Sequence, residues 1–146
     1  MDNSQPSTVT LSIPCAPEYV GTARLTILGV ASRLGFSYDQ IEDIRLAVGE
    51  ACTNAIARAR QGTANPAGQP LLTIRSLIEP TQLTVEVEDN VTGGADAPPE
   101  IIVDGDGTSS HELGALLMEI LVDDFSVEEM DGGGTRVRLV KRTNAE

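Results

Sequence analysis

The chain contains no tryptophan, and only 3% of its 146 residues are aromatic, so its core must be built from Leu, Ile, Val and Ala. There are two cysteines, Cys15 and Cys52, without a Cys-x-x-Cys or Cys/His pattern. This argues against a structural zinc site and against a secreted disulfide scaffold. The sequence lacks the basic and apolar segments of a signal peptide, and no apolar run is long enough for a membrane span. We expect a reduced, cytoplasmic protein without membrane contact.

Basic residues are also scarce. The chain has 10 Lys and Arg against 22 Asp and Glu, which gives a formal net charge of −12. A protein this acidic repels phosphate backbones, so we expect no direct nucleic-acid binding. The acidity does not exclude a basic or mixed-charge protein partner, and a soluble surface without a specific role explains it equally well.

The alternation and spacing of apolar residues predict a single domain. Residues 1–7 are expected to be a disordered tail, and residues 8–142 a domain. The predicted elements are a strand near 9–13, helices at 18–34 and 39–60, strands near 72–76 and 83–88, a helix at 109–122, and strands near 125–127 and 137–141. The long segment 89–108, rich in Gly, Pro and Asp, is expected to be functional or disordered. This order predicts an α+β fold, a two-layer sandwich of a mixed or antiparallel sheet with helices on one face.

Local signals predict where several elements begin and end. Ser37 and Gln40 form a capping box for the second helix. Gly35 is placed to close the first helix. The glycines at 132–134 predict a turn between the last two strands.

The second predicted helix carries a pair of polar residues suited to catalysis and metal binding. Glu50 and Asn54 are four residues apart and therefore share a helical face. A carboxylate can accept a proton from an attacking hydroxyl, and an amide oxygen can ligate Mg²⁺. By itself, such a pair more often faces water.

The sequence around this pair resembles the N box of the GHKL superfamily (gyrase B, heat-shock chaperone, histidine kinase and MutL ATPases). The similarity is greatest to anti-sigma-factor serine kinases of the RsbW and SpoIIAB type, over residues 18–55, and it extends more weakly to about Lys141. The resemblance implies the Bergerat-type ATP-binding fold of HATPase domains, with ATP and Mg²⁺ as cofactors. It also implies that Glu50 is the catalytic base and that Asn54 is the magnesium ligand.

The second family motif, D-x-G-x-G, is altered here. Asp89 matches the residue that hydrogen-bonds the adenine amino group, and Gly93 matches the second glycine, but Val91 replaces the first. A side chain at this position takes room where the backbone must approach the base. Thr135, after the glycine turn, matches a threonine near the adenine. An ordinary strand-end residue at 89 and a hairpin threonine at 135 are the competing interpretations.

The third motif, a glycine pair under the triphosphate, is altered as well. Gly114 matches the second glycine, and Glu112 replaces the first. Ser109 and Glu112 fit a capping box that would satisfy the N–H donors at the helix start, where phosphate would otherwise bind. We therefore expect weakened ATP binding.

The family resemblance and the composition also bear on two arginines and on the single histidine. Arg24, on the first helix, matches a family arginine that contacts sigma factor and anti-anti-sigma factor in turn, and a solvated helix charge is the alternative. Arg58 stands where the family has a histidine. His111 is expected to be a surface residue.

The resemblance implies two functions on one fold. One is a serine/threonine kinase that sequesters a sigma factor, thereby regulating transcription in a stress response, and phosphorylates a serine of an anti-anti-sigma (STAS-type) protein. The alternative is a non-catalytic partner-switching module with weak or no ATP binding. The family also implies a homodimer through the N-terminal strand and first helix. An acidic scaffold protein without a nucleotide site is a third interpretation that only the composition favours.

Overall fold

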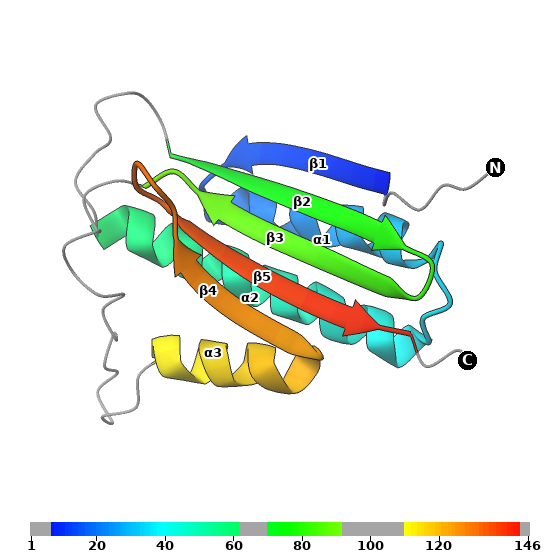
Figure 1. The fold of residues 1–146 in the computed structure, drawn as a ribbon. Helices are drawn as coiled ribbons and strands as arrows, with labels where there is room; N and C mark the ends of the chain where they lie inside the picture. The colour runs from blue at the N-terminus through cyan, green and yellow to red at the C-terminus, as the bar shows by residue number, and fades with distance from the viewer. Residues whose placement is uncertain (1–6, 62–69, 92–109, 144–146) are drawn as a thin grey trace.

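The helices of the protein lie together on one face of a single antiparallel sheet (Figure 1). The computed structural model describes residues 7–61, 70–91 and 110–143. Within these ranges the elements are β1 (Ser7–Pro14), a 3₁₀ turn (Pro17–Tyr19), α1 (Val20–Ala31), α2 (Tyr38–Gln61), β2 (Leu71–Glu79), β3 (Gln82–Asp89), α3 (Ser110–Leu121), β4 (Asp124–Glu129) and β5 (Thr135–Arg142). The predicted α+β two-layer architecture is confirmed.

The strands are ordered β1-β2-β3-β5-β4, and each neighbouring pair is antiparallel. The sheet of the described residues is thus antiparallel throughout. Ser7, which the sequence analysis assigns to the tail, is instead the first residue of β1. It lies opposite Ile78 of β2, so the strand ladder extends one residue further than the apolar alternation from Val9 indicates.

The first helix is shorter than its apolar stripe predicts. The stretch expected as one helix over 18–34 is a 3₁₀ turn followed by α1, which ends at Ala31. After Ala31 the amides of Arg33 and Leu34 bond to carbonyls three residues back, the tighter pattern with which α-helices commonly end. The apolar periodicity continues through this turn because Leu34 still packs against the core.

The ends of the helices are tied to the last strand. The predicted capping box is present: the Ser37 amide donates to Gln40 Oε1, and the Gln40 amide donates to Ser37 Oγ. The Gln40 side chain also donates to the carbonyl of Arg142, 3.2 Å away. Lys141 Nζ donates to the carbonyl of Leu121, the last residue of α3, at 2.6 Å. These contacts fix α2 and α3 relative to β5.

The core fills the space between the helical layer and the sheet. It is aliphatic, as the shortage of aromatic residues predicts, and Phe36, 9% exposed, is its one buried aromatic ring among the described residues. The largest side chains with almost no exposure are Ile27, Ile44, Leu72, Ile74, Leu83 and Leu139. Such a core holds α2 rigidly on the sheet, and α2 carries the polar pair discussed above.

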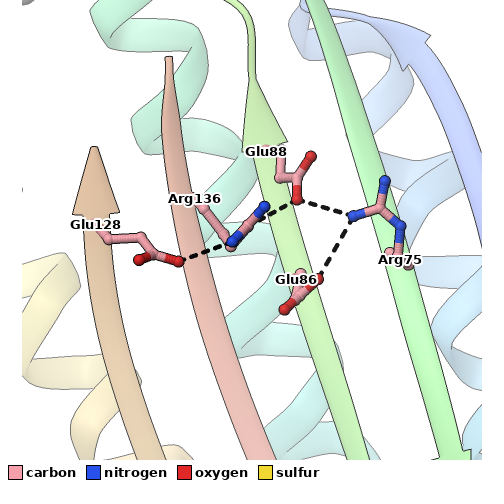
Figure 2. Close-up of polar contacts among 5 residues, drawn as sticks. All are labelled: Arg75, Glu86, Glu88, Glu128 and Arg136. Carbon is pink, nitrogen blue, oxygen red and sulfur yellow. Dashed lines mark hydrogen bonds and ion pairs between the residues drawn. The ribbon is translucent and has the colours of Figure 1, made fainter. Parts of the chain in front are cut away.

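The other face of the sheet carries a ladder of ion pairs across four strands (Figure 2). Glu88 Oε2 lies 2.8 Å from Arg75 Nη1 and 2.8 Å from Arg136 Nε. Arg75 also approaches Glu86 at 3.5 Å, and Arg136 Nη1 lies 2.9 Å from Glu128. Partial burial would raise the pKa of Glu88, but the hydrogen bonds and charges of the two arginines outweigh it and leave that pKa lowered.

In the part of the chain that the structure describes, none of the helices combines the length and apolarity needed to cross a membrane.

Candidate functional site

Three polar side chains lie along one face of α2. Glu50, Asn54 and Arg58 follow one another at four-residue spacing, and all three are half-buried. At a rise of about 1.5 Å per residue, the outer two are roughly 12 Å apart along the helix axis. Only the first two were singled out by the sequence motif, although the same spacing continues to Arg58.

At one end of this face, α3 approaches the polar pair through Gly114. A β-carbon at position 114 would lie 2.8 Å from Glu50 Oε1 and 3.0 Å from Asn54 Nδ2, closer than ordinary van der Waals contact. Gly114 is buried, and its lack of a β-carbon lets the α3 backbone come this near without displacing either side chain. The structure therefore brings together three residues predicted to act together.

At the other end, Arg58 binds Asp89, the last residue of β3. Arg58 Nη2 lies 2.7 Å from Asp89 Oδ2, and Asp89 Oδ1 accepts a hydrogen bond from the Val91 amide at 3.1 Å. The Asp89 side chain is only 1% exposed. Sequence reasoning placed Asp89 in the site but missed its partner, because the two lie 31 residues apart and only the fold brings them together.

The glycine turn between β4 and β5 closes against Asp89. Gly132, Gly133 and Gly134 have φ values of 84°, 101° and 97°, which L-residues other than glycine rarely adopt. A β-carbon at Gly134 would collide with the backbone carbonyl of Asp89. In the backbone register, Glu88 of β3 lies opposite Arg136 of β5. The next position along the two strands therefore sets half-buried Thr135, the first residue of β5, beside Asp89. The two residues predicted to lie near a base are therefore neighbours.

Both cysteines lie beside this end of the site. Burial, and then the negative charge of Asp89, raise the pKa of Cys15 to about 11, although Arg58 opposes the shift. Burial and the nearby Cys15 raise the pKa of Cys52 to about 12. Both are free thiols, uncharged at neutral pH and therefore poor nucleophiles.

Arg24 belongs to α1, and its side chain lies against α2. It is half-buried rather than fully solvated, and its stem passes Gly49 of α2. A β-carbon at Gly49 would be 3.3 Å from Arg24 Cδ, so the glycine makes room for the stem. Arg24 Nε is buried, and none of the residues that the structure describes offers it a hydrogen bond.

The remaining predicted features lie outside the described residues. These are Gly93 and the side chains of Ser109, His111 and Glu112. Within the described ranges, no group of three or more His, Cys, Asp or Glu side chains is placed to hold a metal ion.

Comparison with known proteins places this geometry in context. The model of the family "Histidine kinase-like ATPase domain" matches residues 13–141. The chain is 36% identical to the serine-protein kinase RsbW of Bacillus pumilus over 146 residues, covering 94% of this chain and 87% of that protein. It is 37% identical to RsbW of Listeria monocytogenes over 131 residues, covering 85% of this chain and 81% of the relative.

A solved structure shares the fold. The RsbU and RsbW domains of a Mycobacterium tuberculosis protein match with a TM-score of 0.66 at 17% identity, over 93% of this chain. This chain spans 32% of that longer one, so the likeness concerns a single domain of it.

Proposed function

Because the chain belongs to the histidine kinase-like ATPase family and its curated relatives include serine-protein kinases, we propose that it is an anti-sigma protein serine kinase. In this proposal it binds Mg²⁺ and ATP between α2 and α3, sequesters a sigma factor, and phosphorylates a serine of an anti-anti-sigma protein of the STAS type. The observation that carries the proposal is the meeting of Glu50, Asn54 and Gly114.

The donor set at this end suits a magnesium–phosphate group. Mg²⁺ takes few protein ligands and fills its remaining positions with phosphate oxygens and water, so one amide oxygen from Asn54 is sufficient. Gly114 leaves the space that a β-carbon would fill, directly in front of the carboxylate and the amide. ATP, when bound, supplies the γ-phosphoryl group and, with Mg²⁺, the charge neutralisation on which phosphoryl transfer depends.

Glu50 acts on the substrate serine. Its carboxylate accepts the proton of the serine hydroxyl as the serine oxygen forms a bond to the γ-phosphorus, and the bond from that phosphorus to the bridging oxygen breaks to release ADP. Asn54 and Gly114 position the phosphate end. On the same proposal, Asp89, Gly93 and Thr135 line the base end.

The partner surface of the proposal is the first strand and first helix. Arg24 presents a guanidinium that could anchor a carboxylate of a sigma or anti-anti-sigma partner. β1 is an edge strand of the described sheet, and α1 exposes Leu25 at 63%, so this side is also where we propose the homodimer forms.

A second candidate function is a partner-switching module without kinase activity. The observation that favours it is the ion pair between Arg58 and Asp89, which occupies the carboxylate proposed to read the adenine. In that case, competition between partners alone would control the sigma factor.

Calorimetric titration with Mg²⁺ and ATP, together with phosphotransfer to a purified STAS-type anti-anti-sigma protein, tests the proposal. Glu50→Gln should retain ATP binding and lose phosphotransfer, because only the proton acceptor is removed. Asn54→Ala should lose the Mg²⁺ dependence of ATP binding. Thr53→Ala, exposed on the same helix, is the matched control and should behave as the wild type.

The two candidate functions give different results. ATP binding with phosphotransfer supports the kinase. Binding of the protein partners without any heat or stability change at millimolar ATP supports the second function and rejects the first.

A further inference from the structure

At the base end of the site, the Asp89 carboxylate is already bonded to a side chain of the protein itself, Arg58. Asp89 is the buried carboxylate on which base recognition would depend in the proposed function, yet both of its oxygens are engaged. Oδ2 accepts a charged hydrogen bond from Arg58 at 2.7 Å, and Oδ1 accepts the Val91 amide at 3.1 Å. With 1% of its side chain exposed, the carboxylate is also closed off from solvent.

Arg58 makes this contact from a half-buried position on α2. Its Nη2 bonds to Asp89, whereas its buried Nε has no hydrogen-bond partner within the described ranges. Charged hydrogen bonds of this kind are roughly twice as strong as neutral ones. An amino group of a nucleobase is a neutral donor, so it competes poorly for the same oxygen.

Val91 reinforces the arrangement. Its side chain is buried at 9% exposure directly after Asp89, and its amide holds Oδ1. A ligand that bonds to the carboxylate where Arg58 or the Val91 amide now does would have to displace it.

We propose that Arg58 determines the base specificity of the site. By binding Asp89 it withdraws this carboxylate from base recognition, so that nucleotide affinity does not depend on the 6-amino group of adenine. This inference rests on the proposed nucleotide site between α2 and α3. It assigns a role in specificity to Arg58 and removes that role from Asp89 in the wild-type chain.

The test compares ATP with inosine triphosphate, in which a carbonyl oxygen replaces the 6-amino group. Wild-type protein titrated with each in the presence of Mg²⁺ should bind the two with affinities within about threefold of each other. Arg58→Ala should bind ATP more tightly than the wild type and prefer it over inosine triphosphate by about tenfold or more, since a site that reads a hydrogen-bonding group discriminates strongly against its loss.

A second pair of variants isolates the carboxylate. When Arg58 is already alanine, Asp89→Asn should lower the affinity for ATP about tenfold and abolish the preference over inosine triphosphate. Arg60→Ala, on an exposed position of the same helix, is the matched control and should alter neither preference. If Arg58→Ala does not fold, as judged by circular dichroism, Arg58→Gln replaces it.

The outcomes separate this inference from the proposed function. A wild-type protein that prefers ATP tenfold over inosine triphosphate, and loses that preference on Asp89→Asn, overturns the role of Arg58 but leaves the kinase proposal intact. Failure of wild type and Arg58→Ala to bind either nucleotide at millimolar concentration rejects the nucleotide site itself, and the specificity inference with it.

Discussion

Substituting Gly114 by alanine tests the meeting of α2 and α3 directly. The added β-carbon would lie 2.8 Å from Glu50 Oε1 and 3.0 Å from Asn54 Nδ2, whereas ordinary contact begins at 3.4 Å. The carboxylate must therefore retreat by about 0.6 Å and the amide by about 0.4 Å. Both atoms are the ends of flexible side chains, so they can move without unfolding the helix.

Gly114→Ala should consequently lower the rate of phosphotransfer while leaving the stability of the fold nearly unchanged. Alanine in a helix interior is favoured over glycine by about 1 kcal/mol, which offsets the steric cost. We expect the free energy of unfolding in urea to change by less than about 1 kcal/mol. A misplacement of 1 Å in a catalytic group can lower a rate about a hundredfold, so a shift of half that size should lower phosphotransfer about tenfold.

The matched control is Gly29→Ala. Gly29 lies in α1, and a β-carbon there meets nothing within 4 Å. This variant should gain helix stability without loss of phosphotransfer or ATP affinity. Unchanged phosphotransfer in Gly114→Ala, measured at saturating ATP, would refute the assignment of Glu50 and Asn54 to the reacting groups.

Three further results are expected. Glu88→Gln should lower the free energy of unfolding by about 1–2 kcal/mol at pH 7. Because the folded pKa of Glu88 is depressed, the stability that its charge contributes is present above pH 4.5 and is lost as the pH falls through the folded pKa. Urea melts should therefore show that the stability of the variant falls less steeply than that of the wild type on acidification below pH 4.5. Gly134→Ala combines a φ of 97° with a collision against Asp89 and should cost about 2–4 kcal/mol in thermal melts, whereas Gly132→Ala, with open space around it, should cost only about 1 kcal/mol. With a pKa of about 11, Cys15 should react with a disulfide reagent at pH 8 far more slowly in native protein than in urea, and equal rates would contradict its burial.

Much of the fold was predictable because its signals are local. Alternating apolar residues identify the strands, and the capping box at Ser37 identifies the start of α2. The end of α1 was missed because the apolar stripe continues to Leu34 although the hydrogen-bond pattern changes after Ala31. Periodicity reports which side chains are buried, and a tight turn can bury a leucine as well as a helix does.

The site residues also fall into those that sequence spacing predicts and those that only the fold brings together. Glu50 and Asn54 are one turn apart in sequence, so their shared face was predictable from spacing alone. The pairing of Arg58 with Asp89 was not, because it depends on how β3 lies against α2. Nor could the sequence show that Arg24 is half-buried, since the space for its stem comes from Gly49, on a different helix.

Glu50, Asn54 and Arg58 all belong to one continuous helix, so the two ends of the site cannot move independently. A displacement of α2 along its axis would shift the pair proposed to face the phosphates and the partner of Asp89 by the same amount. Arg24 touches this helix at Gly49, immediately before Glu50. A protein bound over α1 would thus act on α2 through Arg24, at the residue before Glu50, the proposed proton acceptor.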